Sequence, residues 1–298
     1  MFKLYFNDKY DSVVLREVKL LLRLLGYLVL ILYFYSSSVY SKVHVYLSDS
    51  HYKADLLSNS FSSDSYQSLL RSISDTYDLE ILPFARAMKY IKTRKEASCL
   101  LFARKNNERV DEYFFSLPVA ILPSVSLYQK RSDKILDKSV LNESGKIPSL
   151  EKLMASDEKS SLLLASGISY GDFLDEEIKK VEKNQMYRVS LGGADNPVYD
   201  ILSHRKVDYA LMFSSALRNE NISKLRAYEI EGNESYTSSH ILCNRTKESR
   251  EWLAKVNNKL IDLYHTPNFI EEVLVDAPTH LRREIKSQLL SLSNPLEP

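Results

Sequence analysis

Two arginines with a charged turn between them are the residues best suited to binding a ligand. Arg104 directly follows the apolar run 99–103, and Arg109 comes five positions later, next to Glu108. A guanidinium offers a rigid fork of N–H donors that fits a carboxylate bidentately. The pattern therefore makes Arg109, with Arg104 nearby, a candidate for gripping an anionic group. The alternative is a solvated turn in which Arg109 only pairs with the acidic residues beside it.

A helix and a strand must position these arginines. Pro83 suits a first helical turn, because its missing N–H costs nothing there. The residues after it repeat at i, i+3, i+4 and i+7, which predicts one buried helical face made of Phe84, Ala87, Met88 and Ile91. The run 99–103 is short and apolar enough for a buried strand. The chain then resumes as an extended segment at 113–118.

Strand and helix patterns alternate through the first part of the chain. The alternation predicts strands at 43–47 and 78–82 and a helix at 62–77. Strand, helix, strand, helix, strand implies a parallel sheet with helical crossovers. An extended segment at 119–130 then leaves this first unit, and 132–148 reads as a connecting loop.

A second series begins near Leu150. It has a strand at 161–165, the glycine- and serine-containing turn 166–171, and a helix at 173–183 in which Asp175, Glu176 and Glu177 form a solvated face. Further patterns predict a helix capped by Asn196-Pro197, strands at 206–213, 225–231 and 238–244, a helix at 248–264 and a helical tail at 268–298.

Composition excludes several classes of function. Forty basic and 39 acidic residues leave a net charge of +1, which argues against nucleic acid as a partner. Seven glycines form no phosphate-loop or dinucleotide motif, so no nucleotide cofactor is expected. Six scattered histidines lack metal-ligand spacing, so no metal is expected either.

The first 41 residues are typical of an export segment. Basic residues precede an apolar run at 24–35, and Val39 and Ser41 are small enough to flank a cleavage site. Such a run would span roughly 24 Å as a helix even when counted from Leu20, short of the ~30 Å hydrocarbon core. We expect a signal peptide at 1–41, with an uncleaved membrane anchor as the alternative.

The order of these features resembles the family 3 periplasmic solute-binding proteins of the type II fold. The features are Pro83 and Arg86 opening a helix, then the Glu108-Arg109 pair, then the segment 115–118. The resemblance implies an α/β protein with two lobes, mixed sheets and two hinge crossovers, near 124–131 and 230–238. It places the first part of lobe one at 42–127, lobe two at 128–235 and the second part of lobe one at 236–298.

The resemblance also implies a ligand cleft between the lobes. Arg109 matches the family's arginine at the cleft mouth, and Ser169 and Tyr170 lie in the turn that faces the ligand from lobe two. Ile168 stands where close relatives carry an arginine. Phe213 stands where amino-acid-binding members carry an acid, which argues against a standard α-amino acid. Phe213 and Tyr46 would supply apolar walls.

The same fold would bring the two cysteines together. Cys99 lies on a lobe-one strand and Cys243 on the strand that returns to lobe one. In an exported protein a disulfide is then expected, with two buried free thiols as the alternative.

Three functions follow from this sequence. The first is an exported, periplasmic binding protein for a small polar or anionic molecule, working with an inner-membrane permease or a sensor and touching the membrane only through its N-terminal segment. The second is a degenerate interaction or sensor module without a small-molecule ligand. The third is an enzyme in the same cleft, with Asp49, His51 or Glu108 as its acid or base.

Overall fold

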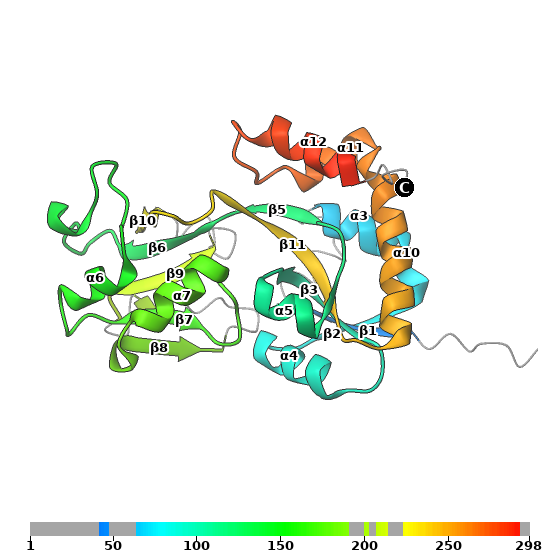
Figure 1. Ribbon diagram of the computed structural model, residues 1–298, viewed down its shortest axis with the longest axis horizontal. Helices are drawn as coiled ribbons and strands as arrows, with labels where there is room; N and C mark the ends of the chain where they lie inside the picture. Colours follow the sequence, from blue (N-terminus) through cyan, green and yellow to red (C-terminus); the bar gives the residue numbers. More distant parts are fainter. Residues whose placement is uncertain (1–41, 48–63, 191–199, 203–206, 214–222, 293–298) are drawn as a thin grey trace, which may run out of the picture. The chain divides into compact units, whose positions relative to one another are not determined.

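The computed structural model describes residues 42–47, 64–190, 200–202, 207–213 and 223–292. The strands of this part form two separate sheets, one of six strands and one of five (Figure 1). The predicted export segment 1–41, the candidates Asp49 and His51, and the Asn196-Pro197 cap lie outside the described residues. Within the described part, every helix is too short or too polar to cross a bilayer.

Lobe one is built on the six-stranded sheet, in the order β2-β1-β3-β11-β4, with β5 also paired to β11. Its strands are β1 (Val43–Leu47), β2 (Tyr77–Ile81), β3 (Ser98–Arg104), β4 (Phe114–Phe115), β5 (Ala120–Pro123) and β11 (Tyr236–Cys243). The first three strands are parallel, because helical crossovers join them, whereas β11 returns antiparallel to β3, β4 and β5. The sheet is therefore mixed, as predicted.

Helices from both ends of the described chain pack on this sheet. They are α3 (Asp64–Ser72), the 3-10 turn η1 (Ser74–Thr76), α4 (Phe84–Thr93), α10 (Lys247–Tyr264), α11 (Pro267–Val273) and α12 (Arg282–Leu292). The predicted face of α4 is confirmed, with Phe84, Ala87 and Ile91 buried. Helix α10 begins at the side-chain cap of Thr246 and buries Trp252, Val256 and Leu260 in the lobe-one core.

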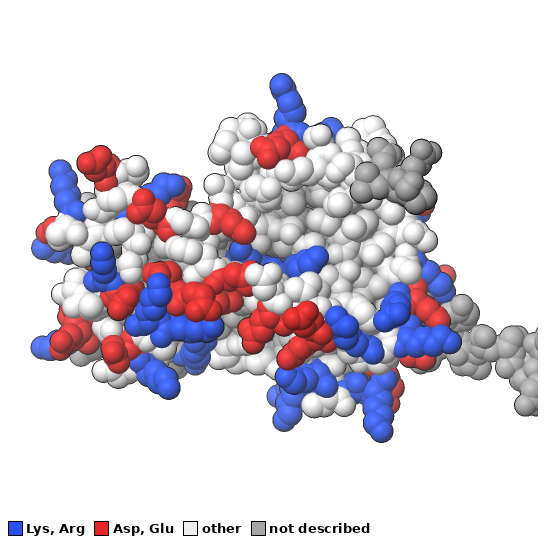
Figure 2. All heavy atoms as spheres, in the orientation of Figure 1, with Lys and Arg blue, Asp and Glu red and all other residues white. Residues whose placement is uncertain are grey.

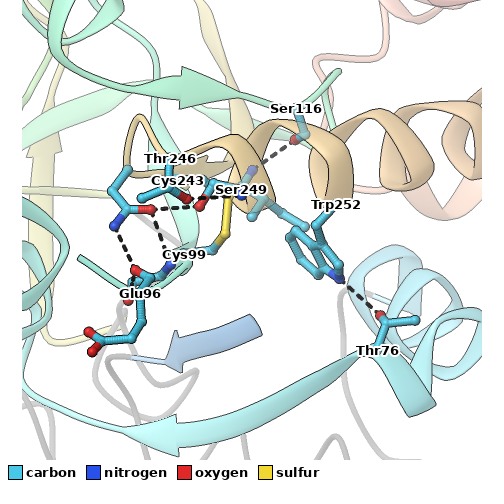
Figure 3. The surroundings of a disulfide bond; sticks show 11 residues. Thr76, Glu96, Cys99, Ser116, Cys243, Thr246, Ser249 and Trp252 are labelled. Atoms are coloured by element: carbon cyan, nitrogen blue, oxygen red, sulfur yellow. Dashed lines mark hydrogen bonds between the residues drawn. A yellow bond between two sulfur atoms is a disulfide. The ribbon is translucent and has the colours of Figure 1, made fainter. Parts of the chain in front are cut away.

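The predicted disulfide joins the start of β3 to the end of β11. Cys99 and Cys243 are directly opposite each other in the sheet and both are fully buried. Figure 3 shows the bond beneath the start of α10, whose Trp252 reaches out to the hydroxyl of Thr76. Asn244 closes the end of β11: its side-chain oxygen accepts hydrogen bonds from the Ser98 N–H and the Ser249 hydroxyl. The disulfide thus ties the returning strand to the first half of the lobe.

Lobe two is built on the five-stranded sheet, in the order β10-β6-β9-β7-β8. Its strands are β6 (Val125–Lys130), β7 (Leu162–Ala165), β8 (Met186–Val189), β9 (Tyr209–Phe213) and β10 (Leu225–Tyr228). Its described residues include the helices α6 (Leu150–Ala155) and α7 (Asp172–Lys180), the 3-10 turns η2 (Lys138–Val140) and η3 (Lys183–Gln185), and a helical piece at 200–202. Both helices contribute to one core, in which Leu150, Leu164 and Leu174 are fully buried.

Two crossovers connect the lobes. The first lies at Ser124, between β5 of one sheet and β6 of the other, and the second comprises residues 229–235. Asn233 joins them, because its side-chain amide donates to the Ser124 hydroxyl at 2.9 Å and to the Val125 carbonyl at 3.0 Å. The first crossover lies at the start of the predicted hinge at 124–131, and the second overlaps the predicted hinge at 230–238. The limits of the lobes at 127 and 235 stay a prediction.

One acidic cluster differs from expectation. Glu176 is exposed as predicted, but Glu177 is buried and its carboxylate accepts the N–H of Leu150 at the start of α6. Burial opposes its charge, whereas its bonds to Lys180 and Leu150 favour it, and the balance lowers the pKa of Glu177. The solvated-face prediction was wrong here because spacing along one helix does not reveal which neighbouring helix needs a cap.

Candidate functional site

A bulge in β3 sets the direction of Arg104. The pairing of β3 with β11 skips one residue between His240 and Leu242, and Phe102 within this irregularity has a φ of +58°. A bulge re-aims the side chains beyond it, at a backbone cost of about 1–2 kcal/mol for a non-glycine residue in the left-handed region. The Phe102 ring packs on Tyr66, with ring centroids 4.0 Å apart. Arg104 follows directly at the end of the strand.

Arg109 lies on a helix rather than in a turn. Helix α5 (Asn107–Glu112) begins after Asn106, whose side-chain oxygen accepts the Arg109 N–H at 3.0 Å. The charged-turn prediction was wrong because one short polar helical turn has no apolar periodicity to reveal it. The Asn106 cap was the available signal.

The turn 166–171 of lobe two faces these residues. Two glycines permit its shape: Gly167 has a φ of +78° and Gly171 a φ of +99°. Both are also close to lobe one. A Cβ on Gly167 would lie 3.3 Å from the Cα of Ala85, and one on Gly171 would overlap the Arg104 guanidinium. The two lobes therefore touch through glycine backbone.

Both arginines donate hydrogen bonds to the turn of lobe two. Arg104 donates from Nη1 to the Tyr170 carbonyl and from Nη2 to the Glu234 carboxylate at 2.7 Å. Arg109 donates from Nη2 to the Gly167 carbonyl at 3.0 Å. Burial lowers the pKa of the Arg109 guanidinium, and the nearby Asp175 carboxylate opposes that shift. The structure thus brings Arg104, Arg109 and the turn together, as expected.

The hydroxyl of Ser169 makes all of its possible hydrogen bonds within the protein. It donates to Asp175 Oδ2 at 2.5 Å and accepts from the Asn106 side-chain amide at 2.9 Å and from the Gly171 N–H at 3.2 Å. A hydroxyl has one donor and two acceptor positions, and all three are occupied. Ser169 therefore joins the two lobes in this structure instead of offering a free hydroxyl.

Tyr170 turns its ring away from the cleft. The ring is buried in lobe two, and its hydroxyl accepts the Ala165 N–H at 2.7 Å. Burial raises the pKa of Tyr170 to about 12, so the hydroxyl stays neutral at physiological pH. Its N–H donates to Asp175 Oδ1 at 2.9 Å. Only the Tyr170 carbonyl faces lobe one, through Arg104.

The two predicted apolar walls do not meet at this site. Tyr46 is fully buried in lobe one, where its ring makes an edge contact with Tyr90. Phe213 ends β9 and packs against the lobe-two core. Ile168 takes their place: it packs against buried residues of lobe two and against the lobe-one cluster that contains Phe84.

Two cavities adjoin these contacts. The larger, about 860 Å³, is lined by Arg109 and Tyr113 of lobe one and by Ser169, Asp175 and Arg188 of lobe two, among others. The smaller, about 590 Å³, lies beside Arg104, Lys105, Glu234 and Ser238. Figure 2 shows acidic and basic side chains interspersed on the face in view, so neither sign of charge dominates it.

A serine and a histidine beside the smaller cavity are arranged like a catalytic pair, but the histidine has too low a pKa to act as its base. His240 Nδ1 faces the Ser116 carbonyl at 2.8 Å, so Nδ1 carries the proton and Nε2 accepts from the Ser238 hydroxyl at 2.8 Å. Burial, with a smaller contribution from Lys105, lowers the pKa of His240 to about 4. The imidazolium that general-base catalysis requires is therefore disfavoured at neutral pH. Within the described residues, no three His, Cys, Asp or Glu side chains form a metal site.

Two α/β lobes, joined by two crossovers and facing each other across a polar cleft, define the two-lobed periplasmic-binding-protein fold. No protein-family model matches this chain, and no match was found among curated proteins. Solved structures do match it, and they carry the fold assignment.

Three of these structures illustrate the likeness. An ancestral arginine-binding protein bound to glutamine has a TM-score of 0.56 at 12% identity, covering 79% of this chain and 97% of its own. A solute receptor for L-cysteine from Neisseria gonorrhoeae has a TM-score of 0.55 at 11% identity, covering 83% and 94%. An arginine third-transport-system periplasmic binding protein from Legionella pneumophila has a TM-score of 0.52 at 16% identity, covering 78% and 97%.

Four site residues were missed by the sequence analysis: Asn106, Asp172, Asp175 and Glu234. Asp175 holds the N–H and hydroxyl groups of the turn, and Asp172 accepts the Asn107 N–H across the cleft at 3.2 Å. Asp172 is the first residue of α7, a position that favours an acidic side chain, so its place in a helix has a sequence signal. Its partner on lobe one has no such signal, because 65 positions separate the two.

Proposed function

We propose that this chain is an exported solute-binding protein that captures a small polar or anionic molecule between its lobes, without making or breaking a bond. The fold supports this, since its solved neighbours include proteins named for binding arginine and L-cysteine. By the same reasoning it works in the periplasm with a permease or a sensor. Its N-terminal segment directs export or tethers it to the membrane.

One observation carries the proposal. Arg109 lies half-buried on α5 at the edge of the 860 Å³ cavity, and residues of both lobes line that cavity. Its acceptor there is a neutral carbonyl, that of Gly167. A ligand carboxylate is a stronger acceptor for a guanidinium than a carbonyl, because it carries a full negative charge and can accept two parallel N–H bonds. An anionic solute can therefore take the place of Gly167 on Arg109.

Calorimetric titration of wild-type protein and an Arg109→Ala variant tests this. Succinate, glutamate, glutamine and arginine serve as probes. Any anionic probe that binds the wild type should bind Arg109→Ala more weakly by at least about tenfold, equivalent to ~1.5 kcal/mol. The matched control is Arg245→Ala, because Arg245 also donates to a carbonyl, that of Val110, but within lobe one. Equal affinities for wild type and Arg109→Ala would remove Arg109 from the binding site.

A second candidate function has its own support. The hydroxyl of Ser169 and the N–H of Tyr170 are both occupied by Asp175, so an anion on lobe two would meet a carboxylate there. This favours an interaction or sensor module without a small-molecule ligand. Native mass spectrometry of protein purified from its own host separates the two functions. A retained small molecule supports solute binding, and repeated emptiness supports the module.

A further inference from the structure

The Arg104 side chain lies at the contact between the two lobes. Its side chain is only 10% exposed. It belongs to β3 of lobe one, yet it donates to the Tyr170 carbonyl in the turn of lobe two and to the Glu234 carboxylate in the second crossover. The guanidinium is thus held by the other lobe and the hinge.

Lobe two leaves space for this guanidinium beside Gly171. Gly171 has no side chain, and a Cβ there would lie 2.3 Å from Arg104 Cζ. The backbone φ of +99° at Gly171 presents the neighbouring Tyr170 carbonyl without strain only because the residue is glycine. The shape of lobe two at this point is therefore complementary to the Arg104 head group.

Other contacts join the lobes at the same place, between residues 104–109 of lobe one and 166–172 of lobe two, which we call the seam. Asn106 bonds to Ser169, Asn107 N–H donates to Asp172, and Ile168 contacts the cores of both lobes. These are polar and apolar contacts of the kind that a bound molecule would otherwise provide.

We propose that Arg104 acts as an internal ligand: its guanidinium, held by the Tyr170 carbonyl and Glu234, keeps the two lobes closed independently of a solute, and opening of the cleft must break these contacts. We call this contact the Arg104 latch. The inference rests on the proposed function, because it concerns the regulation of the same cleft. The latch stabilises the closed state in the absence of solute. The free energy needed to open the cleft then lowers the apparent affinity for a solute.

Removal of the side chain and its chemical replacement test the latch. Arg104→Ala lacks the atoms of one ethylguanidinium ion, so this ion is the probe. The readout is hydrogen exchange of the Asn107 amide, measured by NMR without solute. As the first residue of α5 this amide has no partner within its helix, and its acceptor is Asp172 of lobe two.

We expect at least tenfold faster exchange at Asn107 in Arg104→Ala than in wild type, and recovery with millimolar ethylguanidinium but not with propylammonium, which lacks the fork of donors. The control Arg245→Ala should exchange like wild type. An unchanged rate in Arg104→Ala, or an equal increase in Arg245→Ala, overturns the latch. If Arg104→Ala does not fold, Glu234→Gln changes only an exposed side chain, and it should raise the rate by a smaller factor; no change there also overturns the proposal.

This experiment is separable from the test of the proposed function. The exchange measurement contains no solute, so it reports the latch alone. The titrations of Arg109→Ala report solute binding alone. If the Asn107 amide is protected but no probe binds, the latch stands and solute capture is rejected. If a probe binds but the Asn107 amide is unprotected, solute capture stands and the latch is rejected.

Discussion

Lobe one and lobe two contain the same kinds of element but are completed in different ways. Lobe one combines residues 42–123 with the distant segment 236–292, and Cys99–Cys243 joins these two parts. The strands of lobe two all come from the chain between the crossovers, and this lobe contains no cysteine. Lobe one is therefore stabilised by a long-range link, whereas lobe two depends on its local packing and on contacts with lobe one.

Removal of the disulfide should have the largest effect on this difference. A Cys99→Ala/Cys243→Ala variant loses a link across 144 positions, worth about 4–5 kcal/mol in the chain-entropy account. Urea unfolding should show a fall in the free energy of unfolding approaching this size. The wild type treated with reductant serves as the control. A loss below about 1 kcal/mol would show that lobe one does not depend on the link.

Matched core truncations compare the packing of the two lobes. Leu101 in lobe one and Leu164 in lobe two are both fully buried in strands. Each change to alanine should cost ~2–5 kcal/mol, because it removes buried methyl groups and leaves a cavity. Urea unfolding followed by tryptophan fluorescence, which reports Trp252 of lobe one, should detect Leu101→Ala directly. If Leu164→Ala shifts this signal equally, the lobes unfold together; an unshifted signal shows that they unfold separately.

The buried His240 makes lobe one sensitive to acid. The unfolded imidazole has a pKa near 6.5 and the folded one near 4. The unfolded chain thus binds a proton that the folded chain does not, and the free energy of unfolding falls as the pH drops from 6.5 to 4. The fall amounts to about 3 kcal/mol. A His240→Gln variant cannot titrate there, so its stability should fall less over this range; parallel pH profiles would contradict the assignment.

Two glycine substitutions should have the smallest effect on stability, and they test the contact between the lobes. Gly145→Ala and Gly171→Ala both place a side chain at positive φ, at about 1–2 kcal/mol each. Only at Gly171 does the new Cβ meet Arg104, whereas nothing lies within 4 Å at Gly145. Gly171→Ala should therefore also speed exchange of the Asn107 amide, and Gly145→Ala should not. Equal exchange in both variants would show that Gly171 does not position the latch.

Much of the fold could be predicted from sequence because its signals are local. The apolar face of α4, the strand β3 and the helix α10 each follow from periodicity within a single segment. The disulfide followed from the predicted topology, which returns the chain to lobe one. The order of strands and helices was therefore enough to reach the two-lobed arrangement.

The candidate site was only partly predictable, for a physical reason. Arg104 and Arg109 stood out by type and spacing, but their partners lie 66 and 58 positions away on another lobe. Whether Ser169 offers a free hydroxyl depends on Asn106 and Asp175, which only the folded structure brings to it. The bulge at Phe102 that directs Arg104 has no sequence signal, because a phenylalanine at positive φ is not favoured by any local pattern.

Solution X-ray scattering of the exported protein, wild type against Arg104→Ala and both without solute, tests the closed seam most directly. Any N-terminal segment is common to both proteins, so the difference between their radii of gyration reports the lobes. We expect a compact wild type and a larger radius of gyration for Arg104→Ala, with ethylguanidinium restoring the wild-type value. Identical scattering curves for the two proteins would contradict it.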